Sequence, residues 1–173
     1  QNIMPGIQLL IFGGEHDAVQ LCAFAAMSGW EVTVVTSPSD PKTLDNFPGA
    51  DQVTALAAES LHTLAMDSQT AVILMTHNFA NDLKYITALK DVKLAYLGLL
   101  GPAKRREKLL SQLMEQHPEL HSDFPDAIYG PAGINIGAET PQEIAVSIIA
   151  EILSVMRRQQ PMPLREKKTG IHT

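Results

Sequence analysis

The sequence has little cysteine, no excess of basic charge and no long apolar run, and each absence excludes a class of protein. Cys22 is the only cysteine among 173 residues, which excludes an intrachain disulfide and a metal site built from several thiolates. The formal net charge of −6 argues against general binding to nucleic acid or to anionic membranes. No stretch of about 18 uncharged apolar residues is present, and no signal-peptide pattern opens the chain. We therefore expect a cytoplasmic protein without a nucleic-acid or membrane partner.

Common catalytic motifs are absent as well. The chain contains no Gly-x-Ser-x-Gly elbow, no Walker sequence and no His-Glu-x-x-His motif. His117 and His121 have the spacing of two metal ligands on one helix, but Pro118 between them interrupts a continuous helix. The residues alone therefore indicate neither a catalytic group nor a metal site.

The most informative stretch is the start of the chain. Residues 7–12 are apolar and too few for a helix of their own, so they indicate a buried strand. Gly13 and Gly14 follow, and then an alanine-rich helix extends to about residue 28. A strand, a glycine turn and a helix in direct succession are typical of the first unit of a Rossmann-like sheet. Such a turn lets a ligand approach the backbone, and the helix N-terminus presents N–H groups to an anion.

Two positions depart from a dinucleotide-binding fingerprint. The middle glycine of G-x-G-x-x-G/A is Glu15 here, and its carboxylate would crowd and repel a pyrophosphate. The second predicted strand ends at Thr36, where an NAD site normally has an acid that binds the ribose hydroxyls. Both departures argue against ordinary use of NAD or NADP.

Hydrophobic periodicity and turn residues predict the remaining elements. Strands are expected at residues 31–36, 52–56, 70–75, 93–97 and 127–129. Helices are expected at residues 59–66, 79–90, 102–116 and 141–158, and Thr140, Pro141 and Glu143 start the last one as a capping box. Residues 117–126 are expected to form a polar link, and 130–139 a glycine-rich loop.

The alternation of strands and helices predicts an α/β fold: a doubly wound, mainly parallel, Rossmann-like sheet in three layers. We expect one domain over residues 1–158, with its core at 7–158, followed by a mobile basic tail at 159–173. The expected strand order is 3-2-1-4-5-6, which brings the turns after strands one and four together. Ligands in such folds bind at that edge of the sheet.

Polar residues follow both of these strands. His16 and Asp17 come after the first strand, and Thr76 and His77 come after the fourth. A histidine beside a carboxylate can position a ligand or transfer a proton near neutral pH. The alternatives are that Asp17 only caps its helix while His16 is solvated, and that His77 only fills a turn before the N-cap Asn78.

A basic cluster opens the helix predicted at residues 102–116, immediately after Gly101. It consists of Lys104, Arg105, Arg106 and Lys108. Cations at a helix N-terminus oppose the helix dipole, so the cluster is explained if the site receives a phosphate or another polyanion. The alternative is a solvated basic face whose charge is partly offset by Glu107.

Several segments together closely resemble the XdhC/CoxI family, in its C-terminal Rossmann-like domain, from about residue 7 to residue 157. These segments are Phe12-Gly-Gly-Glu-His-Asp-Ala18, Met75-Thr-His-Asn78 with Asp82, Tyr96-Leu-Gly-Leu-Leu-Gly101 with Lys104-Arg105-Arg106, and Gly130-Pro-Ala-Gly-Ile-Asn-Ile-Gly-Ala-Glu-Thr-Pro-Gln-Glu-Ile-Ala145. The last segment is the most specific, because its elements occur in order and in register.

The resemblance implies an accessory, non-catalytic role in the maturation of a molybdenum hydroxylase. It implies binding of the molybdenum cofactor (molybdopterin) and help with its sulfuration and insertion. The implied partners are the apoenzyme and a cysteine desulfurase, and a homodimer stays open. Together with the residue reasoning, it predicts the cofactor-binding set Gly13, Gly14, His16, Asp17, Thr76, His77, Gly101, Arg105, Arg106, Gly133, Asn135, Gly137 and Thr140.

Two other functions stay open. The first is an NAD(P)-dependent oxidoreductase or another nucleotide-binding Rossmann protein, which the strand–glycine–helix start suggests. The second is a protein-docking module that has kept the fold and lost its ligand, which Glu15 favours.

Overall fold

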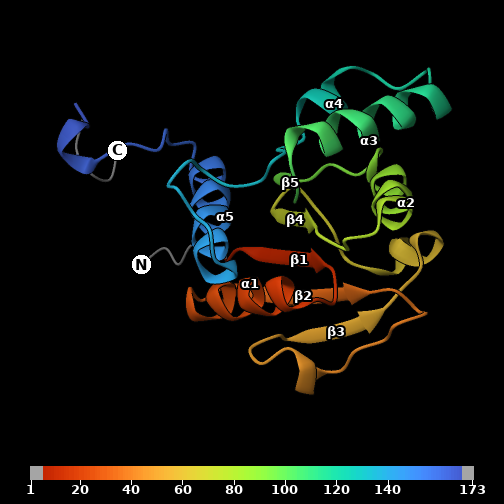
Figure 1. Ribbon diagram of the computed structural model, residues 1–173, viewed down its shortest axis with the longest axis horizontal. Helices are drawn as coiled ribbons and strands as arrows, with labels where there is room; N and C mark the ends of the chain where they lie inside the picture. The colour runs from red at the N-terminus through yellow and green to blue at the C-terminus, as the bar shows by residue number, and fades with distance from the viewer. Residues whose placement is uncertain (1–5, 169–173) are drawn as a thin grey trace.

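The computed structural model describes residues 6–168 and is built on a five-stranded parallel sheet (Figure 1). Its strands are β1 Gln8–Phe12, β2 Glu31–Thr36, β3 Gln52–Ala55, β4 Thr70–Leu74 and β5 Tyr96–Leu99. Their order is β3-β2-β1-β4-β5. β1 pairs in parallel with both β2 and β4, so the predicted neighbourhood of strands one and four is confirmed.

In the described part of the chain, five α-helices accompany the sheet: α1 His16–Met27, α2 Phe79–Leu89, α3 Ala103–Gln116, α4 Asp123–Asp126 and α5 Pro141–Met156. Short 3-10 turns lie at Leu44–Asn46, Ala58–Thr63 and Leu164–Glu166. Within residues 6–168, no helix has both the length and the apolar character that crossing a bilayer requires.

The core is divided by the sheet into two apolar clusters, as the predicted three-layer fold requires. Alternate residues of one strand point to opposite faces: Leu9 and Ile11 lie in one cluster, and Leu10 and Phe12 lie in the other. The first cluster joins the sheet to α1 and α5, and the second joins it to α2 and α3. β1 is buried on both faces, which explains its continuous apolar sequence.

The structure corrects the prediction at the β5 edge. The strand expected at residues 93–97 begins only at Tyr96 and includes Gly98 and Leu99, because the chain joins β4 where Ala95 N donates to Thr70 O (2.9 Å). The sixth strand expected at residues 127–129 is reduced to a single parallel bridge between Gly98 and Tyr129. It cannot extend because the N–H of Ala127 already completes α4.

Two further departures concern short segments. The helix expected at residues 59–66 is a 3-10 turn at Ala58–Thr63, and the link expected at 117–126 contains α4. The tail expected at residues 159–173 is described only to residue 168, and that part contains a 3-10 turn at Leu164–Glu166.

Cys22 is fully buried in the cluster between the sheet and α1, and we predict that it is inert in the folded protein. Burial, with Asp51 nearby, raises the pKa of its thiol to about 11. A folded-state pKa above the unfolded value disfavours the thiolate, so stability should fall as the pH rises from about 9 to about 11. Labelling with a disulfide reagent at neutral pH should be slow in buffer and fast in urea. Equal labelling rates would contradict the prediction.

Candidate functional site

The carboxyl ends of β1 and β4 lead into two turns that meet through a histidine–carboxylate contact. After β1, the N–H of Gly13 donates to Val35 O (3.0 Å), and α1 begins three residues later. The Asp17 carboxylate lies in the first turn of α1, where Oδ1 accepts from Ala18 N (2.8 Å). Its Oδ2 lies 2.5 Å from Nε2 of His77, in the turn after β4. Asp17 therefore does more than cap its helix.

His77 is held in an unusual backbone conformation. Its φ of 61° lies in the left-handed region, which residues with a Cβ adopt at an energetic penalty. The residue stays there between the end of β4 and the N-cap Asn78, whose side chain accepts from Asn81 N (2.9 Å). Strain of this kind is common at binding sites, where the surrounding structure holds a side chain in place.

A buried carboxylate, Asp82, organises the same turn and reaches across to α3. Its Oδ1 accepts from the Thr76 hydroxyl (2.7 Å) and the Thr76 N–H (3.3 Å). Its Oδ2 accepts from Nη2 of Arg105 at 2.6 Å. The Asp82 side chain is 1% exposed and that of Arg105 is 21% exposed. Burial raises the pKa of Asp82, while the hydrogen bonds from Thr76 and the charge of Arg105 oppose the shift.

These two pairs line one cleft, with a cavity volume of about 630 Å³. This volume is within the usual range for small-molecule sites. The polar lining is Asp17, His77, Asp82, Gly101 and Arg105; the apolar lining is Met75, Leu100, Pro102, Pro131, Ala132 and Ile144. The cleft thus lies where the strands end, between the turns after β1, β4 and β5 and the loop before α5. A few convergent polar groups on an apolar wall can orient a small ligand and exclude water from part of it.

The structure brings together only some of the predicted site residues. Asp17, His77, Gly101 and Arg105 line the cleft, and Thr76 donates a hydrogen bond to Asp82, which also lines it. The buried Gly13 packs against the backbone of Met75, and the exposed His16 does not line the cleft.

Gly14 and Arg106 lie elsewhere. Gly14 lies against Thr36 and Lys42. Arg106 points toward the segment before the β5 bridge, where its Nη2 donates to Pro125 O (2.9 Å) and its Nε donates to Ile128 O (3.2 Å). Its guanidinium supports this segment and does not face the cleft.

The residues of the glycine-rich loop that line the cleft are not the predicted ones. Pro131 and Ala132 line the cleft, whereas Gly133, Asn135, Gly137 and Thr140 do not. Gly133 has a φ of +116°, and its N–H donates to Glu151 of α5 (2.9 Å). The side chain of Thr140 accepts from Glu143 N and caps α5, as its capping-box sequence predicts.

The residue that sequence reasoning missed is Asp82 as the partner of both Thr76 and Arg105. The sequence did contain a signal for this role: Asp82 is a charged residue one turn into α2, whose side toward the sheet is otherwise apolar. The basic cluster is also partly explained by a contact that no pattern revealed, because Arg105 and Lys108 both lie over the ring of Phe79, at 5.6 Å and 5.4 Å.

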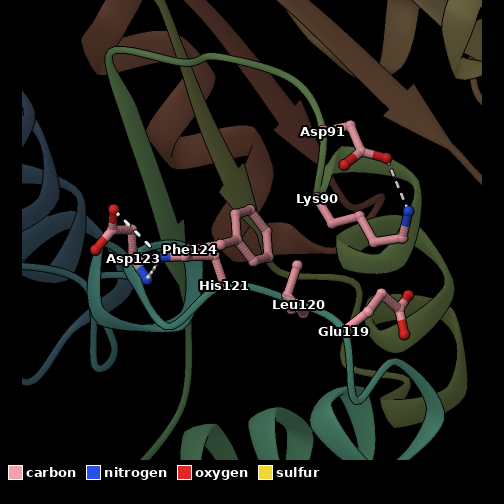
Figure 2. Close-up of a pocket in the computed structure, with 7 residues that line it drawn as sticks. All are labelled: Lys90, Asp91, Glu119, Leu120, His121, Asp123 and Phe124. Atoms are coloured by element: carbon pink, nitrogen blue, oxygen red, sulfur yellow. Dashed lines mark hydrogen bonds and ion pairs between the residues drawn. The ribbon is translucent and has the colours of Figure 1, made fainter.

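A second hollow lies where the end of α2 meets the segment between α3 and α4 (Figure 2). Lys90 is paired with Asp91 (2.8 Å), and His121 is paired with Asp123 (3.3 Å). His117 pairs with Glu119 (3.4 Å) rather than with His121. Among the described residues, no group of three or more potential metal-ligating side chains gathers here or elsewhere.

Comparison with known proteins identifies the family of this chain. The chain matches the XdhC Rossmann domain over residues 9–152. It belongs to the XdhC family. The match covers β1 from Leu9, the other four strands and most of α5, and it includes every residue that lines the cleft.

Three proteins from bacteria are similar to this chain. A probable xanthine dehydrogenase subunit of Bacillus subtilis (strain 168) is 38% identical over 159 residues, covering 91% of this chain and 46% of its own. "Molybdenum cofactor insertion chaperone PaoD" of Escherichia coli (strain K12) is 27% identical over 156 residues, covering 90% and 42%. A solved structure described as a xanthine dehydrogenase from Bacillus halodurans has a TM-score of 0.76 and 28% identity, covering 95% and 46%. The chain spans less than half of the length of each of these proteins.

Proposed function

We propose that this chain binds the molybdenum cofactor in the cleft between Arg105 and His77 and serves the maturation of a molybdenum hydroxylase. The observation that carries the proposal is the position of Arg105, which lines the cleft and is held there by Asp82 (2.6 Å). The relative named as a molybdenum cofactor insertion chaperone supports this choice of ligand. Help with sulfuration and insertion, with the apoenzyme and a cysteine desulfurase as partners, is part of the same proposal.

The residues of the cleft fit this ligand. When bound, molybdopterin supplies a phosphate and a dithiolene that holds the metal. A guanidinium has five N–H donors, of which Asp82 accepts one here, so Arg105 can also donate to a phosphate. Helix α3 begins at Ala103, and its first turn adds backbone N–H groups that have no hydrogen-bond acceptor within the helix.

The two carboxylates of the cleft hold its two basic side chains in place. Asp82 fixes the direction of the Arg105 guanidinium, and Asp17 fixes the ring of His77. Because the Asp17 carboxylate lies against Nε2, that nitrogen donates to it, and Nδ1 is the ring nitrogen available to a polar group of the ligand. The apolar residues Met75, Leu100 and Ile144 can cover a flat ring system and keep water from it.

The variant His77→Gly tests the cleft without weakening the fold. Glycine adopts a φ of 61° without penalty, so the unfolding free energy should stay the same or rise by about 1 kcal/mol. The Kd for the cofactor should increase about tenfold, because the imidazole is lost. Equilibrium ultrafiltration with anaerobically prepared cofactor, with molybdenum measured by mass spectrometry, gives this value.

The matched control is His62→Ala, which removes an exposed histidine of the Ala58–Thr63 turn that does not line the cleft. It should bind as tightly as the unmodified protein. No binding of cofactor to the unmodified protein, or equal binding by His77→Gly, would refute the proposal. Binding of NAD in its place would favour the nucleotide-binding alternative.

A further inference from the structure

Helix α5 has an apolar face that no described part of the chain covers. Between Ile144 and Met156 its only charged residue is Glu151, and that side chain is used internally. Its Oε1 accepts from the Tyr96 hydroxyl (2.7 Å) and from Gly133 N (2.9 Å). A helix that is apolar on nearly all sides is normally buried on nearly all sides.

Only part of α5 is buried within this chain. Ala145, Ile148 and Ile152 pack into the cluster that α5 shares with α1 and the sheet. Val146 and Leu153 are 48% and 39% exposed. They lie roughly 120° around the helix from the buried face. Figure 1 shows α5 at the outer side of its layer, away from α2 and α3.

Two exposed large apolar side chains lie on α5 itself. The described residues include eight exposed large hydrophobic side chains, and Val146 and Leu153 are the two that lie on α5. Exposed apolar side chains that share one face of a helix mark an interaction surface more often than scattered single residues do.

The outer face has the spacing of a helix–helix seam. Glu143, Val146, Ala150, Leu153 and Arg157 follow one another in steps of three, four, three and four residues. This repeat is the one that lines the contact in paired helices. The seam spans about 21 Å at a rise of 1.5 Å per residue, and the small Ala150 at its centre permits a close approach.

The charges at its two ends identify the occupant. The exposed Glu139 and Glu143 lie at the start of α5, and the exposed Arg157 and Arg158 lie at its end. An antiparallel second copy places its basic end beside the acidic end of the first, and the same contact recurs on the other side. Such self-complementarity is what a two-fold interface requires.

We propose that two copies of this chain associate through α5, packed antiparallel about a two-fold axis at Ala150. Val146 and Leu153 fill the apolar centre of the interface. Glu143 of each copy faces Arg157 of the other. The cleft stays open in this arrangement, because its α5 residue, Ile144, is not part of the seam.

Sedimentation velocity over a concentration series tests the interface. The unmodified protein should be a dimer, and Leu153→Glu should raise the dimer Kd at least about tenfold while keeping the circular dichroism spectrum. The matched control is Met114→Glu, on α3 in the other layer, where Met114 is 51% exposed. It should leave the dimer intact.

Cross-linking with Ala150→Cys gives an independent result. The two introduced thiols should form an intermolecular disulfide on mild oxidation, since residues on a two-fold axis are close enough to bond. The proposal would be overturned if the unmodified protein is a monomer. It would also be overturned if only a different protein binds the α5 face. A dimer that survives Leu153→Glu without forming this cross-link would overturn it too.

Discussion

Replacing Arg105 with alanine is expected to lower the unfolding free energy by about 3 kcal/mol at neutral pH. The change leaves Asp82, whose side chain is 1% exposed, without its cationic partner. Removing one member of a buried ion pair has effects of about 3–5 kcal/mol, and the partial exposure of Arg105 places this pair at the lower end. Urea denaturation of both proteins measures the difference.

The loss should depend on pH in a defined direction. Burial raises the pKa of Asp82, so the folded protein takes up this proton at a higher pH than the unfolded chain does. The ionised form is therefore the destabilising one, and its effect is complete well above the folded pKa. As the pH falls through that value, Asp82 becomes neutral and the difference between the variant and the unmodified protein should shrink.

The controls for Arg105 separate charge from packing. Arg105→Lys keeps a cation near Asp82 and should lose less stability than Arg105→Ala. Asp82→Asn in the Arg105→Ala background should restore part of the loss, because no buried charge then remains unpaired. A loss that is the same at every pH would show that Arg105 acts through packing alone.

The second large effect is expected from Gly13→Ala, which should lower the unfolding free energy by at least about 3 kcal/mol. A Cβ at this position would lie 2.5 Å from the carbonyl oxygen of Met75 and 3.0 Å from its carbonyl carbon. Both atoms belong to the backbone directly after β4, so relief requires the two central strands to separate at their ends. Overpacking that moves backbone is among the most destabilising substitutions.

Gly14→Ala is the matched control for this variant. Its Cβ would meet the Lys42 side chain at 3.3 Å, and that flexible chain can move aside. The unfolding free energy should change by less than about 1 kcal/mol. Equal losses for both alanines would mean that the glycine turn is intolerant as a whole, which would contradict the specific contact between Gly13 and Met75.

The central strands were predictable because burial on both faces leaves a pattern in the sequence. β2 occurs at the predicted residues, and β1 and β4 each differ by one residue at one end. Their parallel pairing then follows from right-handed crossovers, so the meeting of Asp17 with His77 followed from topology. The β5 edge was harder to predict. Val92, Leu94 and Ala95 are apolar but do not belong to a strand, and the partner of an edge strand depends on distant segments.

Within the site, adjacent residues could not be distinguished by sequence. Arg105 and Arg106 occupy the same basic cluster, but neighbouring side chains on a helix point about 100° apart. The rotation of α3 is determined by Leu109, Leu110 and Leu113 in the core, and it directs Arg105 to the cleft and Arg106 to Pro125 and Ile128. The residues of the loop before α5 were likewise predicted to bind the cofactor from their residue types alone. Which of them face the cleft depends on the contacts of the loop with α5.

The location of the bound cofactor tests the central claim most directly. A crystal structure of the protein grown with molybdenum cofactor should show the phosphate at Arg105 and the N-terminal turn of α3, with the ring system between Leu100, Ile144 and His77. Cofactor bound at the turn between Gly14 and Lys42, or on any surface away from Arg105, would contradict the account.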